Sequence, residues 1–461
     1  MLWTALGLLV TGWDRGQGLA ELALGALVLA VISGAARHEP NDRHLLLLAG
    51  GLALLSLWAL WQETFGFHLA HEGLAALPEN VRNAVRFRLD SGRAFASQLH
   101  PGHLGVLLAT VVPLAGAGIA GRRHRRLWLF VLFLASLGLV LARSPLTMAL
   151  AAAGLLATLP SGRGRGLRLV AAASSLILLA VVVFLRPDLL HLDPIVWRLE
   201  NWHNALWVWS GSPITGVGLG GFGQAALSVP FPVPNHPLHA HNLPLEWLAE
   251  MGLPGLFLAI VLYYWIFSVA LRLWRHHRGL AAAILIVPLH NLADFSLFQP
   301  GIAVVWATLV GWALAVAPAT SESRSVAGRR WTAATAAALA AAFFGLSWAA
   351  SAVLHRPSLH AQGASALHAE ILAHELAPWQ PLSPTLAQSA LSATGAEATI
   401  LARVIRHERW WRPHSATLAR ATSLLAARAG DLPTASADAW EAKAFTALDR
   451  RMANPPAGPA P

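Results

Sequence analysis

The sequence predicts an all-α, polytopic membrane protein. Of its 461 residues, 56% are hydrophobic and only 12% are charged, whereas soluble domains contain about 25% charged residues. Apolar runs of spanning character recur along the chain, several near the short limit for crossing a bilayer, and we count about eleven of them. They lie near 1–12, 19–35, 45–62, 104–120, 127–142, 145–160, 169–185, 254–271, 279–293, 301–318 and 331–352.

The basic residues gather in every second loop between these predicted spans. The loops 36–44, 121–126, 161–168, 272–278 and 321–330 hold nearly half of the 33 Lys and Arg residues. Because cytoplasmic loops carry such an excess, we place these loops inside, and we place 63–103, 186–253 and the chain after about 353 outside. Topology thus explains the net charge of +10, and we expect no nucleic-acid partner.

Two features of composition limit the chemistry and divide the chain. The absence of cysteine excludes disulfides, thiol catalysis and Cys-based zinc sites. From about residue 355 the apolar spans stop, and amphipathic helices are expected up to a Pro-rich end. The segment 416–445 resembles one tetratricopeptide-type helix–turn–helix unit. We expect this tail to be a small helical domain outside the membrane that either packs on the protein or docks a protein partner or acceptor.

The most informative polar residues lie in the stretch 236–255, HPLHAHNLPLEWLAEMGLPG. Asn242 is the expected N-cap of a short helix that Gly252 ends. Glu246 and Glu250 are four residues apart and therefore share one face of this helix. Glu250 is the more unusual of the two, because a carboxylate near the C-terminal end gains nothing from the helix dipole.

Three histidines, His236, His239 and His241, precede this helix in a Pro-rich loop. Imidazoles can bind zinc, but His239 and His241 are only two residues apart and no Cys is present. We therefore expect no metal. A general base that works near neutral pH is the alternative, since it suits a histidine beside a carboxylate.

The residues before this stretch predict an aromatic helix and then a glycine-rich loop. The helix begins at Asp193-Pro194 and ends before Gly211, and it carries Arg198 near one face with Trp202. The loop, GSPITGVGLGGFG, does not follow a strand, so a nucleotide-binding loop is not expected. It is either a tight turn that dips toward the membrane or a set of backbone amides that approach a lipid diphosphate.

Two further charged residues stand at the expected outer ends of spans. Arg143 lies between two spans, where it either has a function or extends along the membrane interface. Asp294 follows the ninth predicted span and is either functional or an ordinary helix-end carboxylate. The charges of 63–103 are balanced, which is typical of an interfacial helix, and we assign this loop no chemistry.

With these residues in view, the chain resembles the O-antigen ligase and polymerase family of bacterial surface polysaccharide assembly, best over 127–318. The order of the short motifs carries the resemblance: Arg143-Ser144 after a mid-chain span, Arg198, PxxGxGxGxF from Pro213 to Phe222, His241-Asn242, ExGxxG from Glu250 to Gly255, and HxxxD from His290 to Asp294. The motifs do not separate ligases from polymerases.

The resemblance implies a metal-independent membrane glycosyltransferase without a cofactor. Such an enzyme moves a glycan from an undecaprenyl-diphosphate carrier to a hydroxyl of lipid A core, of another glycan or of a protein serine. The site and the tail would face the periplasm from the bacterial inner membrane, among membrane lipids. Arg143 and Arg198 would compensate the diphosphate charge, and His241 would be the base, with Glu250 as its partner. The expected supporting residues are Ser144, Asn242, His239 and Asp294.

The predicted division of the chain follows from this resemblance. Residues 1–126 form N-terminal spans with the outer loop 63–103, 127–318 form the ligase-like core with the catalytic loop 186–253, 319–354 contain the last span, and 355–461 form the tail. The rival functions are an O-linked protein oligosaccharyltransferase of the same family, a transporter or flippase of lipid-linked sugars, and an assembly scaffold. Transporters often contain related repeats and bind near the bilayer midplane, whereas here the charges gather on the outer side.

Overall fold

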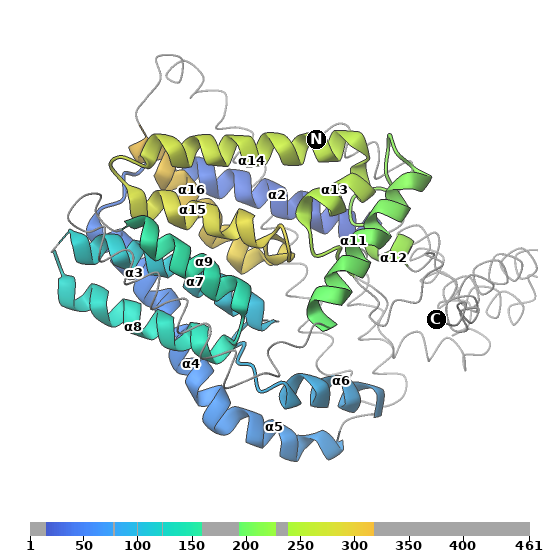
Figure 1. Ribbon diagram of the computed structural model, residues 1–461, viewed down its shortest axis with the longest axis horizontal. Coiled ribbons are helices and arrows are strands. Elements are labelled where there is room, and N and C mark those ends of the chain that lie inside the picture. Colours follow the sequence, from blue (N-terminus) through green and yellow to red (C-terminus); the bar gives the residue numbers. More distant parts are fainter. Residues whose placement is uncertain are drawn as a thin grey trace, which may run out of the picture. The chain divides into compact units, whose positions relative to one another are not determined.

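The computed structural model describes residues 15–76, 79–98, 100–121, 123–158, 193–226 and 238–317, and these residues form helices and no strand (Figure 1). The predicted all-α class is therefore confirmed for this part of the chain. Five described helical stretches are long and apolar enough to cross a membrane: Gln17–Ala35, Asp42–Gly73, Pro101–Ala120, Arg125–Ala142 and Leu253–Leu273. Shorter apolar helices are Pro145–Thr158, Arg278–His290 and Pro300–Val316.

Each of these helices coincides with one of the predicted spans. The remaining predicted spans, 1–12, 169–185 and 331–352, lie outside the described residues, as do the whole segment 319–354 and the tail 355–461. The total of about eleven spans and the helical tail domain therefore stay predictions.

The chain divides into two compact units. As far as they are described, the first contains residues 15–27 and 194–260, and the second contains residues 28–158 and 261–317. The division falls within two long helices, α2 (Arg15–Ala35) and α14 (Leu253–Leu273).

The second unit is built around α7 (Pro101–Ala120), which is buried from Pro101 to Ala115. This helix packs against α3 (Asp42–Ala53), α8 (Arg125–Ala142), α9 (Pro145–Thr158) and α15 (Arg278–His290) (Figure 1). The helix α16 (Pro300–Val316) packs on α15 and on the 3-10 turn η4 (Ser296–Phe298). A helix that is apolar on all sides is expected to be buried, and α7 occupies that place here.

Small residues bring the helices of the second unit close together. A methyl group at Gly105 of α7 would overlap the side chain of Thr147 on α9, and one at Gly138 of α8 would overlap Ser56. Close packing through small residues is typical of helices that associate inside membranes, where the hydrophobic effect does not drive helices together. Large apolar side chains of the same unit also face outward: Phe133 is 62% exposed and Leu271 is 71% exposed.

The helical structure of the third predicted span continues past its expected end at residue 62. After α4 (Leu55–Trp61) come a π-helical segment, η1 (Gln62–Gly66), and then α5 (Phe67–Gly73). No proline interrupts this stretch, and Gly66 lies within helical backbone. A 3-10 turn, η2 (Leu74–Ala76), and α6 (Glu79–Asp90) follow, so the helix expected in the loop 63–103 is present.

The first unit is also helical where the structure describes it. It contains the first part of α2, α11 (Asp193–Gly211), α12 (Phe222–Ala226), α13 (Leu243–Met251) and the first part of α14. Its core is small and lies between α11, α12 and α13, with Val208, Phe222 and Ala249 among its buried residues. The predicted bounds of the aromatic helix and of the short helix after Asn242 are confirmed.

Candidate active site

The short helix α13 begins and ends where its sequence predicts. Asn242 caps it, since the Asn242 side chain accepts a hydrogen bond from the backbone N–H of Leu245 at 3.0 Å. Gly252 follows the helix with a φ of +67°, a conformation that favours glycine. A methyl group there would also overlap the backbone carbonyl of Ile214, so the end of α13 lies directly against the glycine-rich loop.

Glu246 in the first turn of α13 binds the histidine loop. Its Oε1 lies 2.6 Å from Nδ1 of His239, and its Oε2 accepts a hydrogen bond from the backbone N–H of Ala240 at 3.0 Å. Glu246 is only 1% exposed, so these contacts stand in for solvation of a buried carboxylate. Among the predicted supporting residues, His239 is the one whose side chain contacts the carboxylate of Glu246.

The glycine-rich loop packs on the end of α13 through its backbone. The amides of Val217 and Gly218 donate to the carbonyls of Ala249 and Glu250 at 3.1 and 2.9 Å. The amide of Phe222 donates to Oε1 of Glu250 at 3.2 Å. These N–H groups are used inside the protein, so the structure favours the tight-turn interpretation of this loop over a cradle of amides for a diphosphate.

Glu250, one turn after Glu246, lies against the glycine-rich loop. Its described hydrogen bonds run to the backbone amides of Phe222 and Gly220, whereas the carboxylate in contact with a histidine is Glu246. The reason is the direction of the helix: Glu250 lies one turn further along α13, where the glycine loop crosses. The pairing of Glu250 with His241 stays a prediction.

Three carboxylates meet in the first unit. One oxygen from each of Glu21 on α2, Glu246 and Glu250 lies within 4.8 Å of the others. Burial raises the pKa of Glu250 well above its usual value of 4.5, and the negative charges of Glu21 and Glu246 add to this effect. In the described residues this is the acidic group that could hold a metal ion; otherwise a proton on Glu250 relieves the repulsion.

His241 lies at the junction between the histidine loop and α11. Its φ is +54°, which is uncommon for a residue with a side chain. Its carbonyl accepts a hydrogen bond from Nε1 of Trp202 at 3.3 Å. Trp202 is one turn after Arg198 on α11, so the two share a helix face, and Arg198 is half-buried. His236 lies outside the described residues.

Arg143 belongs to the second unit and is part of an ion pair. It caps the C-terminus of α8 with a φ of +46°, and its Nη2 donates to Oε1 of Glu63 on the π-helical segment. Ser144 is buried and its carbonyl accepts a hydrogen bond from Thr147 as α9 begins. Sequence reasoning assigned no role to Glu63, because nothing local marks a partner 80 residues away.

Asp294 also lies in the second unit and is buried between two histidines. Its oxygens lie 3.8 Å from Nε2 of His103 and 3.7 Å from Nε2 of His290. His100, which caps α7 by accepting from the amide of Gly102, packs beside His103. Burial lowers the pKa of His100 to about 3, which matches its role as an acceptor. The sequence HPGH at the start of a span was the signal for this group.

The candidate residues thus form two groups, one in each unit. Arg198, His239, His241, Asn242 and Glu250 belong to the first unit, and Arg143, Ser144 and Asp294 belong to the second.

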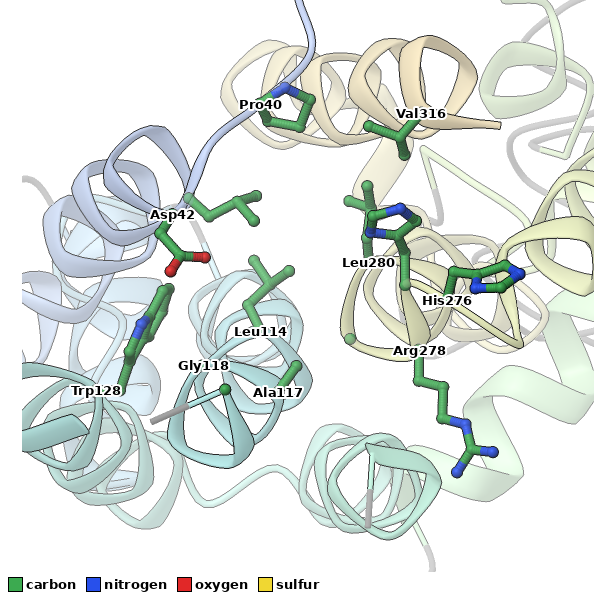
Figure 2. Close-up of a pocket in the computed structure, with 14 residues that line it drawn as sticks. Pro40, Asp42, Leu114, Ala117, Gly118, Trp128, His276, Arg278, Leu280 and Val316 are labelled. Carbon is green, nitrogen blue, oxygen red and sulfur yellow. The ribbon is translucent and has the colours of Figure 1, made fainter. Parts of the chain in front are cut away.

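A separate pocket of about 220 Å³ lies in the second unit, and none of the predicted site residues lines it. It is formed by the ends of α3, α7, α8, α15 and α16, at the loops that the sequence places inside. Figure 2 shows Asp42 and Trp128 on one wall and His276 and Leu280 on another.

Taken together, these features define a helical membrane protein with histidines, arginines and carboxylates at the ends of its helices. Residues 128–260 match the family model described as O-Antigen ligase. The family resemblance seen in the sequence is confirmed for this part of the chain, and the match supports a membrane role as a glycosyltransferase-type ligase in polysaccharide biosynthesis. No curated protein matches the chain.

Proposed function

We propose that the protein transfers a glycan from an undecaprenyl-diphosphate carrier to a hydroxyl acceptor on the periplasmic face of the bacterial inner membrane. The observation that carries this proposal is the match to O-antigen ligases over residues 128–260, which include Arg143, Arg198 and His241. The basic loops between the apolar spans support the orientation, because positive loops favour the cytoplasmic side.

In the proposed reaction, the acceptor oxygen attacks the anomeric carbon of the donor glycan as the bond from that carbon to the diphosphate breaks. The proton of the hydroxyl passes to the imidazole of His241, and undecaprenyl diphosphate leaves. A diphosphate needs charge compensation rather than protonation, and guanidinium groups suit bidentate phosphate contacts. We assign that role to Arg143 and Arg198, without a metal or cofactor.

The remaining polar residues act through the fold in this proposal. Asn242 caps the helix behind His241, and Ser144 begins the helix after Arg143. We give Glu250 a supporting role, because its hydrogen bonds to the loop at Gly220 and Phe222 join that loop to α13. Asp294 holds His103, near the start of α7, and His290, at the end of α15, beside each other.

A second candidate for the base is His239. Its Nδ1 contacts Glu246, and a carboxylate that orients an imidazole in this way is a feature of many general bases. Replacing each of the two histidines in turn with asparagine distinguishes which of them is the base. Asparagine tolerates the left-handed backbone at position 241, so loss of activity in His241→Asn reports on the imidazole rather than on backbone strain.

The test is a transfer assay with the purified full-length protein in detergent, a polyprenyl-diphosphate oligosaccharide donor and three acceptors: lipid A core, a second donor molecule and a serine-containing peptide. We expect product on lipid A core and a fall in kcat of about 10²-fold or more in His241→Asn. Lengthened lipid-linked glycan would instead mean a polymerase, and glycopeptide would mean protein glycosylation. The absence of product in every case would favour a transporter of lipid-linked sugars.

A further inference from the structure

Arg143 is held by a carboxylate from a distant part of the chain. Its ion pair with Glu63 joins the end of α8 to the π-helical segment between α4 and α5. The side chains of Arg143 and Glu63 are 20% and 23% exposed, so the pair is largely shielded from solvent but still accessible. A partly shielded ion pair is less weakened by solvent and salt than one on an open surface.

The π-helical segment binds not only Arg143 but also the loop that precedes α7. Oε1 of Gln62 accepts hydrogen bonds from the backbone N–H groups of Phe95 and Ala96, both at 2.9 Å. The loop that contains these residues is joined to the end of α8, since the amide of Ala94 donates to the carbonyl of Leu141 at 3.0 Å. One turn of π-helix, a feature frequently found at functional sites, thus fixes both the loop and the guanidinium.

The loop also limits where the Arg143 side chain can lie. A methyl group at Gly92 would stand 2.9 Å from Nη1 of Arg143, so glycine leaves room for the guanidinium there. Arg143 has a positive φ, which is a backbone conformation that arginine rarely adopts. This conformation sets the direction in which its side chain leaves the backbone. The backbone conformation of Arg143, the space beside Gly92 and the carboxylate of Glu63 together therefore fix the position of the Arg143 guanidinium.

We propose that Glu63 is a positioning residue that orients the Arg143 guanidinium for the diphosphate of the donor. This inference rests on the proposed function of Arg143. A guanidinium has five N–H donors in a planar fork, and the described pair with Glu63 engages Nη2. The other donors of Arg143 are left for phosphate oxygens, and Glu63 reduces the loss of side-chain freedom on donor binding.

The experiment measures kcat and the KM for the polyprenyl-diphosphate donor in Glu63→Ala, Glu63→Gln, Arg143→Ala and the double variant of the full-length protein. We expect Glu63→Ala to raise the donor KM by about tenfold with kcat changed by less than about threefold. Glu63→Gln keeps an acceptor oxygen and should recover most of the affinity. The double variant should be no worse than Arg143→Ala, because Glu63 acts only through Arg143.

Glu72 on α5 provides the matched control, since its side chain is 63% exposed and its described ion pair is with the i−4 residue His68. Glu72→Ala should leave the KM unchanged, and the thermal unfolding midpoints of all variants show whether folding is intact. A parental KM in Glu63→Ala beside a raised KM in Arg143→Ala would overturn the positioning role alone. Multiplied losses in the double variant would indicate a structural role instead. A parental KM in Arg143→Ala would overturn the proposed function of Arg143 and this inference with it.

Discussion

Oε1 of Glu246 lies 2.6 Å from Nδ1 of His239, and both residues belong to the same unit of the fold. This contact joins the histidine loop to the first turn of α13. Because Glu246 also accepts from the amide of Ala240, one buried carboxylate determines where the loop begins its turn into the helix. The conformation of His241, two residues later, depends on that anchor.

Replacement of Glu246 should therefore destabilise this unit. Glu246→Ala would leave the buried N–H of Ala240 without an acceptor, which costs about 1–3 kcal/mol. Glu246→Gln retains one acceptor oxygen and should cost less. Thermal unfolding in detergent measures both variants, with Glu72→Gln as the control on an exposed carboxylate. Equal unfolding midpoints for Glu246→Ala and the parent would contradict this role for the anchor.

The protonation of Glu250 predicts a pH dependence of stability. Burial and the charges of Glu21 and Glu246 raise the pKa of Glu250 above 4.5, so the folded protein binds a proton that the unfolded chain releases. The contribution of Glu250 to stability is greatest below pH 4.5 and is lost as the pH rises through the raised pKa.

Glu250→Gln mimics the protonated carboxyl and still offers an oxygen to the amide of Phe222. We expect it to unfold at a higher temperature than the parent at pH 8 and to lose less stability between pH 5 and pH 8, a range of about three units over which a buried carboxyl can titrate. Unfolding scans across this range measure the difference. An equal pH dependence in the variant and the parent would mean that Glu250 is not the group that titrates.

Gly216 is the glycine of the loop that we expect to tolerate substitution least. Its φ is +67°, and a methyl group would overlap the backbone of Glu250, so Gly216→Ala should cost at least about 1–3 kcal/mol. Gly211 at the end of α11 has open space around it, and Gly211→Ala is the control. Similar unfolding midpoints for the two variants would show that the loop can move away from α13.

Removal of divalent metals tests whether the three carboxylates of the first unit hold an ion. In the proposed reaction guanidinium groups compensate the diphosphate charge, so turnover should be unchanged after treatment with a chelator and after addition of Mg²⁺ or Mn²⁺. If the chelator stops turnover and Mn²⁺ restores it, the group of Glu21, Glu246 and Glu250 becomes the metal site to test, by Glu21→Gln.

Much of the secondary structure could be predicted because its signals are local. The cap at Asn242, the stop at Gly252 and the bounds of α11 each depend on residues within one or two turns, and the apolar runs mark the spans directly. The continuation of the third predicted span through η1 was missed, since no local residue distinguishes a π-helical turn from the end of a helix. His103 was missed because the HPGH motif at the start of α7 shows no partner for it, and Asp294 lies near it only in the fold.

The sequence by itself determined the class of protein, the family resemblance and the short helix after the histidines, and it predicts which residues act on a lipid diphosphate. Only the tertiary structure decided which charges meet. Glu63 reaches Arg143 across 80 residues, and Glu21 on α2 joins Glu246 and Glu250 on α13 although the two helices are far apart in the sequence. Such contacts depend on how buried helices pack, because a charge inside a protein needs a partner close in space. That partner can be far away in the sequence, so the residues around the charge do not indicate which partner it has.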